Sequence, residues 1–141
     1  MVGRGWNERE IGLNQQIVQI MVLVRDYDEA IDFYCRVLGF DLLEDTKRSQ
    51  TKRWVRVAPN SGGCSMLLAK AVTPEQEACV GSQTGGRVLL FIHTDDFDAY
   101  YAQLQSHSVE FAGEPRDEDF GKVVVFLDLY GNKWDLIEPK A

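Results

Sequence analysis

Two segments of the chain repeat one pattern of apolar and polar positions. Residues 19–28 and 89–98 each consist of an apolar run, an acidic turn and the start of an amphipathic stretch. Apolar runs of this length next to turn residues are typical of strands, and the spacing that follows is typical of helices. Because the copies lie about half a chain length apart, the repeat predicts two similar modules.

Capping residues predict where the helices of the two modules begin. Asp26 is followed by Glu29 three positions later, which is the capping-box pattern, and Asp96 has the same place in the second copy. The first helix is expected to end at Gly39. The apolar positions expected to face the core are Ala30, Ile31, Tyr34, Val37 and Leu38 in the first helix, and Phe97, Tyr100, Tyr101 and Leu104 in the second.

The remaining apolar runs complete an α+β domain that spans residues 1–141. A polar arm (1–14) precedes a first βαβββ module (about 15–70), a connector (71–86) and a second βαβββ module (87–139). Pro74 is expected to open a short helix over 75–79. The expected strands are 17–24, 40–45, 53–58 and 64–69 in the first module, and 87–94, 109–111, 122–128 and 133–138 in the second.

Composition excludes several classes of function. The chain has 141 residues, of which 45% are hydrophobic and 26% charged, as in ordinary globular proteins. Its net charge of −7 argues against nucleic-acid binding, and no apolar run is long enough to cross a membrane. Residues 1–12 lack the apolar core of a signal peptide. Cys35, Cys64 and Cys79 lack C-x-x-C spacing, which favours reduced thiols in the cytoplasm over a zinc site.

Two stretches resemble a known superfamily. Residues 24–34 with 37–40 resemble the opening of a vicinal-oxygen-chelate module, and residues 126–138 resemble its closing hairpin. This is the superfamily of glyoxalase I, bleomycin-resistance proteins and extradiol dioxygenases, and the resemblance covers about residues 15–139. It implies two βαβββ modules that form open, cup-shaped mixed sheets with helices on the convex faces. It also implies a homodimer.

The resemblance further implies four metal-ligand positions, which fall on Gln19, Met66, Leu89 and Asp135. Only Gln19 and Asp135 offer oxygen, because leucine has no donor atom and a thioether suits soft metals. We therefore expect no cofactor, with a divalent metal (Zn, Ni, Fe or Mn) as the alternative. Without a metal, Gln19 and Asp135 are expected to line a wet pocket.

Strand alternation predicts which side chains line the cup. His93 could act as an acid–base group or only form a hydrogen bond at a strand end. Arg56 could bind a carboxylate or phosphate, or lie in solvent. Aromatic residues and Met66 could stack on a planar ligand, or belong to the core or a dimer interface. The expected ligand-binding set is Gln19, Met21, Trp54, Arg56, Met66, Leu89, Phe91, His93 and Asp135, with Leu23, Cys64, Leu68 and Ile137 also facing the cup.

Two functional hypotheses follow. The first is a metal-independent protein that binds a small, partly aromatic or amphiphilic molecule; the acidic net charge is compatible with a cationic ligand. The second is a lyase or isomerase of lactoylglutathione lyase type, or a dioxygenase-like enzyme, with a rebuilt site that uses His93 or Asp135 as acid or base. A third possibility is a subunit whose dimer surface is its function. The expected partners are a small molecule and a second copy of the chain, with no nucleic acid and no membrane.

Overall fold

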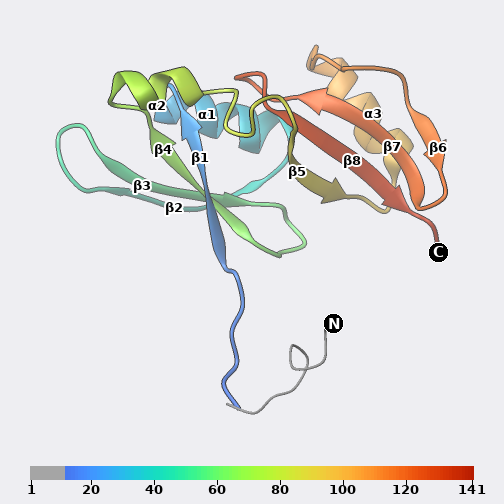
Figure 1. Cartoon of the computed structure of the whole chain (residues 1–141), viewed down its shortest axis with the longest axis horizontal. Helices are drawn as coiled ribbons and strands as arrows, with labels where there is room; N and C mark the ends of the chain where they lie inside the picture. The colour runs from blue at the N-terminus through green and yellow to red at the C-terminus, as the bar shows by residue number, and fades with distance from the viewer. Residues whose placement is uncertain (1–11) are drawn as a thin grey trace.

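The computed structural model describes residues 12–141 and contains two four-stranded mixed sheets lying side by side (Figure 1). The first sheet has the order β1-β4-β3-β2, in which β1 runs parallel to β4 and the other pairs are antiparallel. Its elements are β1 (Gln19–Val24), α1 (Tyr27–Ile31), the wider helical turns of η2 (Asp32–Val37), β2 (Asp41–Lys47), β3 (Arg53–Ala58) and β4 (Ser65–Lys70).

The second sheet repeats this plan with the order β5-β8-β7-β6, and β5 runs parallel to β8. The sheets confirm the predicted fold class and both βαβββ modules. The elements after β4 are α2 (Pro74–Cys79) in the connector, then β5 (Val88–His93), α3 (Phe97–Ser106), β6 (Arg116–Glu118), β7 (Gly121–Leu127) and β8 (Lys133–Pro139).

One predicted strand is wrong. Residues 109–111 form no named strand, and the edge strand β6 lies at 116–118 instead. Phe111 makes a single bridge to Phe126, and its ring packs on Tyr101 with 4.8 Å between centroids. The apolar residues at 109–111 therefore pack into the core and do not form part of a β-ladder. The part of the predicted arm that covers residues 1–11 lies outside the described residues.

The predicted capping residues hold the helix starts. The Asp26 carboxylate accepts a hydrogen bond from the Glu29 backbone N–H at 3.0 Å, and the Asp96 carboxylate accepts one from Ala99 at 3.1 Å. Gly39 has a positive φ of 81°, which suits the end of the first helical segment. No helix among residues 12–141 is long and apolar enough to cross a membrane.

One hydrophobic core joins the two modules. The faces of both sheets that pack on helices carry fully buried side chains, such as Val22 and Leu68 in the first sheet and Leu136 in the second. Aromatic rings fill the space between the modules: Trp134 of β8 lies 6.0 Å from Tyr34 of η2 and 5.9 Å from the ring of Phe40. The second module is thus packed against the first through a shared aromatic cluster.

A buried carboxylate adds polar ties between the modules. Asp128, in the turn after β7, accepts hydrogen bonds from the Tyr34 hydroxyl at 2.7 Å, Trp134 Nε1 at 3.1 Å and Asn132 Nδ2 at 3.0 Å. Its other oxygen accepts two backbone N–H groups of the turn. In the opposite direction, the Tyr100 hydroxyl of α3 donates to the Leu38 carbonyl at 2.6 Å. Tyrosine hydroxyls therefore connect the modules in both directions, since the Tyr130 hydroxyl of the second module also donates to Glu29 Oε2 at 2.6 Å.

The connector is attached to the outer edge of β1. The Gln83 side chain donates to the Met21 carbonyl at 3.1 Å and accepts from the Leu23 backbone N–H, so it bonds the strand as a neighbouring strand would. Nearby, a Cβ at Gly81 would collide with the Tyr130 carbonyl oxygen, so only glycine fits there. The connector is thus fixed to both modules.

Candidate functional site

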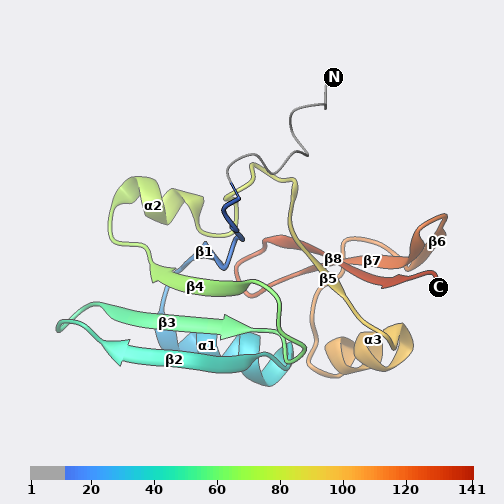
Figure 2. The same cartoon turned by 90° about the horizontal axis from the view of Figure 1, so that it is seen from below.

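The concave face of the first sheet holds a cavity of about 560 Å³. The strand register places Met21 beside Leu67 and Leu23 beside Ala69, on the face opposite the buried Val22 and its neighbours under α1. Figure 2 shows α2 on the far side of β4 from β3, where the start of the connector closes one end of the cavity. The cavity, called the cup below, is lined in its apolar part by Met21, Leu23, Trp54, Leu67, Ala69 and Val72.

The predicted orientation of β4 is wrong. Met66 and Leu68 are only 3% and 1% exposed, and the register pairs them with Val57 and Val55 on the helix-covered face. Residues 65–68 are all buried, so the sequence shows no alternation that could reveal which of them face the cup. Leu67 therefore takes the cup position that was expected for Met66.

The rim of the cup is basic. Its charged lining residues are Lys52, Arg53 and Lys70, and no acidic residue of the described chain lines it. Arg53 is bound to Asp45 at 2.7 Å and Asp28 at 2.8 Å, which leaves the two lysines as the unshared charges among the lining residues. Although the whole chain has a net charge of −7, the charge around this cavity is positive. The local electrostatic field therefore favours an anionic group on a ligand.

Arg56, which was expected to bind an anion, is held within the sheet. Its Nε donates to Glu44 Oε1 at 3.1 Å across the β2–β3 ladder. This hydrogen bond lowers the pKa of the Glu44 carboxyl. The guanidinium remains partly exposed, so anion binding by Arg56 stays a prediction.

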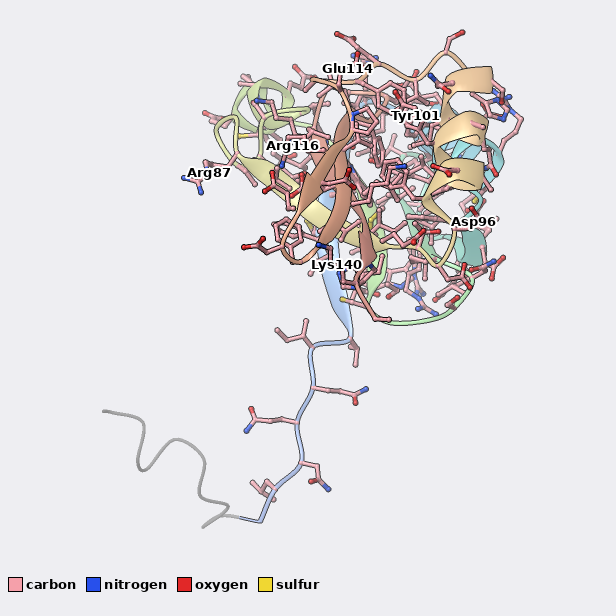
Figure 3. All side chains as sticks on the ribbon, turned by 90° about the vertical axis from the view of Figure 1, so that its right-hand side faces the viewer. Arg87, Asp96, Tyr101, Glu114, Arg116 and Lys140 are labelled. Atoms are coloured by element: carbon pink, nitrogen blue, oxygen red, sulfur yellow. The ribbon has the colours of Figure 1, made fainter. Side chains whose placement is uncertain are left out.

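The concave face of the second sheet carries Asp135 and Phe91, which are register partners on β8 and β5. Burial raises the pKa of Asp135, and the positive charge of Arg116 opposes that rise. Figure 3 shows Arg116 and Arg87 on one side of the β6–β7 ribbon and Tyr101 with α3 on the other. Phe91 is 64% exposed. This face thus presents a partly buried carboxyl group beside an exposed ring.

Leu89 and His93, which were also predicted as site residues, lie neither beside Asp135 nor in the cup. Leu89 falls at a register shift between Val88 and Leu90 and packs against the core. His93 ends β5 and lines two cavities between the modules, not the cup. The structure therefore does not gather the predicted set into one site; Met21 and Trp54 are the members that line the cup.

The donor atoms do not fit the four-ligand metal centre implied by the resemblance. Gln19 lies in the first sheet and Asp135 in the second, while Met66 and Leu89 pack in or against the core. Within residues 12–141, no three His, Cys, Asp or Glu side chains gather closely enough to hold a metal ion. We derive no chemistry through such a centre.

Comparison with known proteins agrees with the paired sheets. Residues 16–136 match the family model described as the Glyoxalase/Bleomycin resistance protein/Dioxygenase superfamily. The chain belongs to this superfamily. Its helix-facing positions and closing hairpin are therefore features of a shared fold. Membership in the superfamily does not determine what the cup residues bind, which depends on the side chains of this chain.

Individual proteins resemble the chain over nearly its whole length. An uncharacterized protein of Shewanella frigidimarina is 52% identical over 128 residues, covering 89% of this chain and 95% of the relative. TnmS3, an antibiotic binding protein from Streptomyces sp. CB03234, is 33% identical with a TM-score of 0.75, covering 90% and 98% of the two chains. A glyoxalase/bleomycin resistance protein from the same organism is 32% identical with a TM-score of 0.68, covering 87% and 100%.

Sequence reasoning missed part of the cup of this superfamily member. Leu67 and Ala69 could be found only from the register of β4 against β1. Lys52 precedes β3, and Lys70 ends β4, so their proximity depends on the folded sheet. Gln76 reaches the cup from the connector, and no local pattern indicates that.

Proposed function

We propose that this superfamily member binds a small amphiphilic molecule in the cup, without a divalent metal. The observation that carries the proposal is a cavity of about 560 Å³ with an apolar floor and lysines at its rim. Sites of this size and makeup suit small organic ligands. An aromatic part of the ligand would contact Trp54 and Leu67, and an anionic group would approach Lys52 and Lys70.

Similarity to TnmS3 supports a binding role, because that protein is described as antibiotic binding. The proposal transfers only the general property of holding a small molecule in the fold. It assigns no particular antibiotic to this chain, because a shared fold does not determine which ligand is bound. The expected chemistry of the ligand is inferred from the basic rim and the apolar floor of this chain's own cup.

We further propose that a second copy of the chain completes the cup. Met21 is 53% exposed and lies on the concave face of the first sheet, which remains open in a single chain. Exposed apolar side chains of this size favour an interface. Sedimentation equilibrium at micromolar concentration is expected to give a homodimer, and a monomer under those conditions would contradict this step.

A matched pair of tryptophan substitutions tests the cup. The probe is dansyl-6-aminohexanoic acid, a naphthalene dye with a carboxylate tail, whose fluorescence rises in an apolar site. Ala69→Trp places a large ring in the cup and is expected to weaken binding on the order of tenfold. Ala102→Trp places the same ring on the exposed face of α3, outside the cup, and should leave binding unchanged. Equal binding by the parent and Ala69→Trp would contradict the proposal.

A charge substitution tests the rim. Lys70→Gln is expected to weaken binding of the same probe about two- to fivefold, since partly exposed charge pairs contribute modestly. Lys140→Gln, near the end of the chain and remote from the cup, is the control. Metal analysis of protein purified without chelator completes the test: stoichiometric Zn, Ni, Fe or Mn that survives dialysis would contradict metal-independent binding.

One observation favours an enzyme as the second candidate. Burial raises the pKa of the partly buried Asp135 carboxyl, and perturbed pKa values of this kind are common among catalytic acids and bases. Under this alternative, Asp135 or His93 serves as base in a reaction of lactoylglutathione lyase type. Turnover of the methylglyoxal–glutathione hemithioacetal that Asp135→Ala abolishes, and the exposed Asp119→Ala does not, would replace the binding proposal.

A further inference from the structure

Two further cavities lie between the modules, away from the cup. The boundary between the two modules is called the seam below. The loop between β3 and β4 forms one wall, and the corner between β5 and α3 forms the other. The cavities measure about 610 Å³ and 420 Å³. The two cavities are adjacent and together are called the seam groove. Five residues line both of them: Phe40, Pro59, Ser61, Ile92 and His93.

The smaller chamber of the seam groove is apolar. Its lining includes the exposed ring of Phe91 and the apolar side chains of Leu90, Met66 and Trp134. Pro59 and the turn at Gly62 and Gly63 form the facing wall. A flat aromatic group could therefore lie between Phe91 and this turn, in contact with apolar atoms on both sides.

The larger chamber is polar and acidic. Asp95 and Asp96 at the start of α3 are its charged lining residues, and Asn60 and Gln103 add amide groups. Among the described residues, no lysine or arginine lines either chamber. Both carboxylates are exposed, and Asp96 already accepts the Ala99 N–H as the helix cap. This chamber therefore favours a positive charge.

Hydrogen bonds hold the walls of the larger chamber in place. The Tyr100 hydroxyl donates to the Leu38 carbonyl at 2.6 Å, and Gln103 Nε2 donates to the Val37 carbonyl at 3.0 Å. Both bonds connect α3 to the end of the first module's helical segment. The groove is thus shaped before any ligand enters, which reduces the entropy that binding has to overcome.

From the two joined chambers we propose that the seam groove is a second binding site, for a cationic amphiphile. The aromatic end of such a molecule occupies the apolar chamber beside Phe91, and its ammonium group occupies the acidic chamber near Asp95. This site differs from the cup in its place and in the sign of its charge. It does not depend on the proposed function of the cup.

The test uses two dyes with the same fluorophore and opposite tails. Dansylcadaverine carries an ammonium group, and dansyl-6-aminohexanoic acid carries a carboxylate. Fluorescence titration of the full chain is expected to show dansylcadaverine binding that weakens on the order of tenfold in Ser61→Trp, which fills the wall shared by both chambers. The cup variant Ala69→Trp should leave dansylcadaverine binding unchanged while it weakens binding of the carboxylate dye.

A matched charge pair separates a local effect from a general one. Asp95→Asn is expected to weaken dansylcadaverine binding about two- to fivefold. Asp119→Asn makes the same change in net charge on an exposed turn outside the groove and should have no effect. Circular dichroism of each variant shows whether the fold is retained, and backbone amide shifts at 92–96 in the parent locate the bound dye directly.

Three results would overturn the proposal. The first is absence of dansylcadaverine binding to the parent at millimolar concentration. The second is loss of binding in Ala69→Trp but not in Ser61→Trp, which would place the cation in the cup. The third is an equal loss in Asp95→Asn and Asp119→Asn, which would show attraction to the acidic surface as a whole. The cup proposal is judged separately, by the carboxylate dye.

Discussion

The two modules have the same strand plan but offer different surfaces on their concave faces. The first carries the cup, with Leu67 at its floor and lysines at its rim. The second presents Asp135, whose pKa is raised by burial, beside the exposed ring of Phe91. On the helix-covered faces both modules instead carry fully buried apolar residues, such as Val22 and Leu136.

This difference shows that the repeat preserves the helix-covered faces of the sheets but not their concave faces. The side of each sheet that builds the shared core keeps its apolar character, because a polar residue there would be buried without a partner. The concave side faces solvent or ligand, so its residues can differ between the copies. Similar strands are therefore a guide to the fold, and a poor guide to the chemistry of either concave face.

The largest expected effect comes from removing the carboxylate that ties the modules together. Asp128→Ala leaves the Tyr34 hydroxyl, Trp134 Nε1 and the Asn132 amide without their buried acceptor. We expect a loss of about 4 kcal/mol in the free energy of unfolding, measured by urea denaturation. Asp119→Ala, on an exposed turn, is the control. A loss below about 1 kcal/mol would mean that the modules do not depend on this tie.

Two methionines on opposite faces of the first sheet test the corrected orientation of β4. Met66 is buried on the helix side and Met21 is exposed on the concave side. Met66→Ala is expected to cost about 3 kcal/mol in urea denaturation. Met21→Ala should cost well under about 1 kcal/mol. Similar losses for the two variants would contradict the assignment of faces.

Two of the tyrosines that bond across the modules, Tyr34 and Tyr100, should differ in their contribution to stability. Tyr34 donates to a carboxylate, and Tyr100 donates to a backbone carbonyl. Tyr34→Phe is expected to lower the free energy of unfolding by about 2 kcal/mol and Tyr100→Phe by about 1 kcal/mol, because hydrogen bonds to charged acceptors are stronger. Thermal unfolding of both variants measures the difference, and a reversed order would contradict the ranking of the two hydrogen bonds.

The smallest effects are in the dependence of stability on pH. The Asp135 pKa is raised from its ordinary value of 3.8, so its contribution to stability is present at low pH and is lost as the pH rises through the raised value. Asp135→Asn should therefore unfold at a higher temperature than the parent at pH 7, and this gain should disappear toward pH 3.8.

Glu44 in the first module should show the opposite dependence. Its pKa is lowered from 4.5 by the hydrogen bond from Arg56, so its contribution is present above that value and is lost as the pH falls through the lowered one. Glu44→Gln should be less stable than the parent at pH 7, and the difference should vanish at low pH. If both variants shift the melting temperature with pH in the same direction, the contrast between the two carboxylates is wrong.

Much of the fold could be predicted from local signals. Asp26 and Asp96 indicate the helix starts because a cap acts within three residues, and the apolar runs indicate seven of the eight strands within residues 12–141. The exception is the region at 109–111, where apolar residues contribute to the core without joining a ladder. The cytoplasmic location stays a prediction.

The candidate site could be predicted only in part. Met21 and Trp54 were expected on the concave face and do line its cavity, because alternation in their strands is visible. Ligand binding by these two residues stays a prediction. Leu67 was missed because four successive buried residues hide the face of β4. The acidic and basic cavities were missed because each is assembled from residues far apart in the chain, as Lys52 and Lys70 show. The bond between Tyr34 and Asp128 spans 94 positions and likewise leaves no local pattern.

The Gln83 side chain has a consequence for how the protein behaves at high concentration. An uncovered edge strand offers its backbone groups to other chains and can start aggregation. Gln83 occupies two of these groups on β1, although it lies about 60 positions away in the sequence. Protection of this edge therefore depends on an intact connector, and a proteolytic cut near Gln83 would expose β1 to strand pairing with neighbouring molecules while both sheets remained folded.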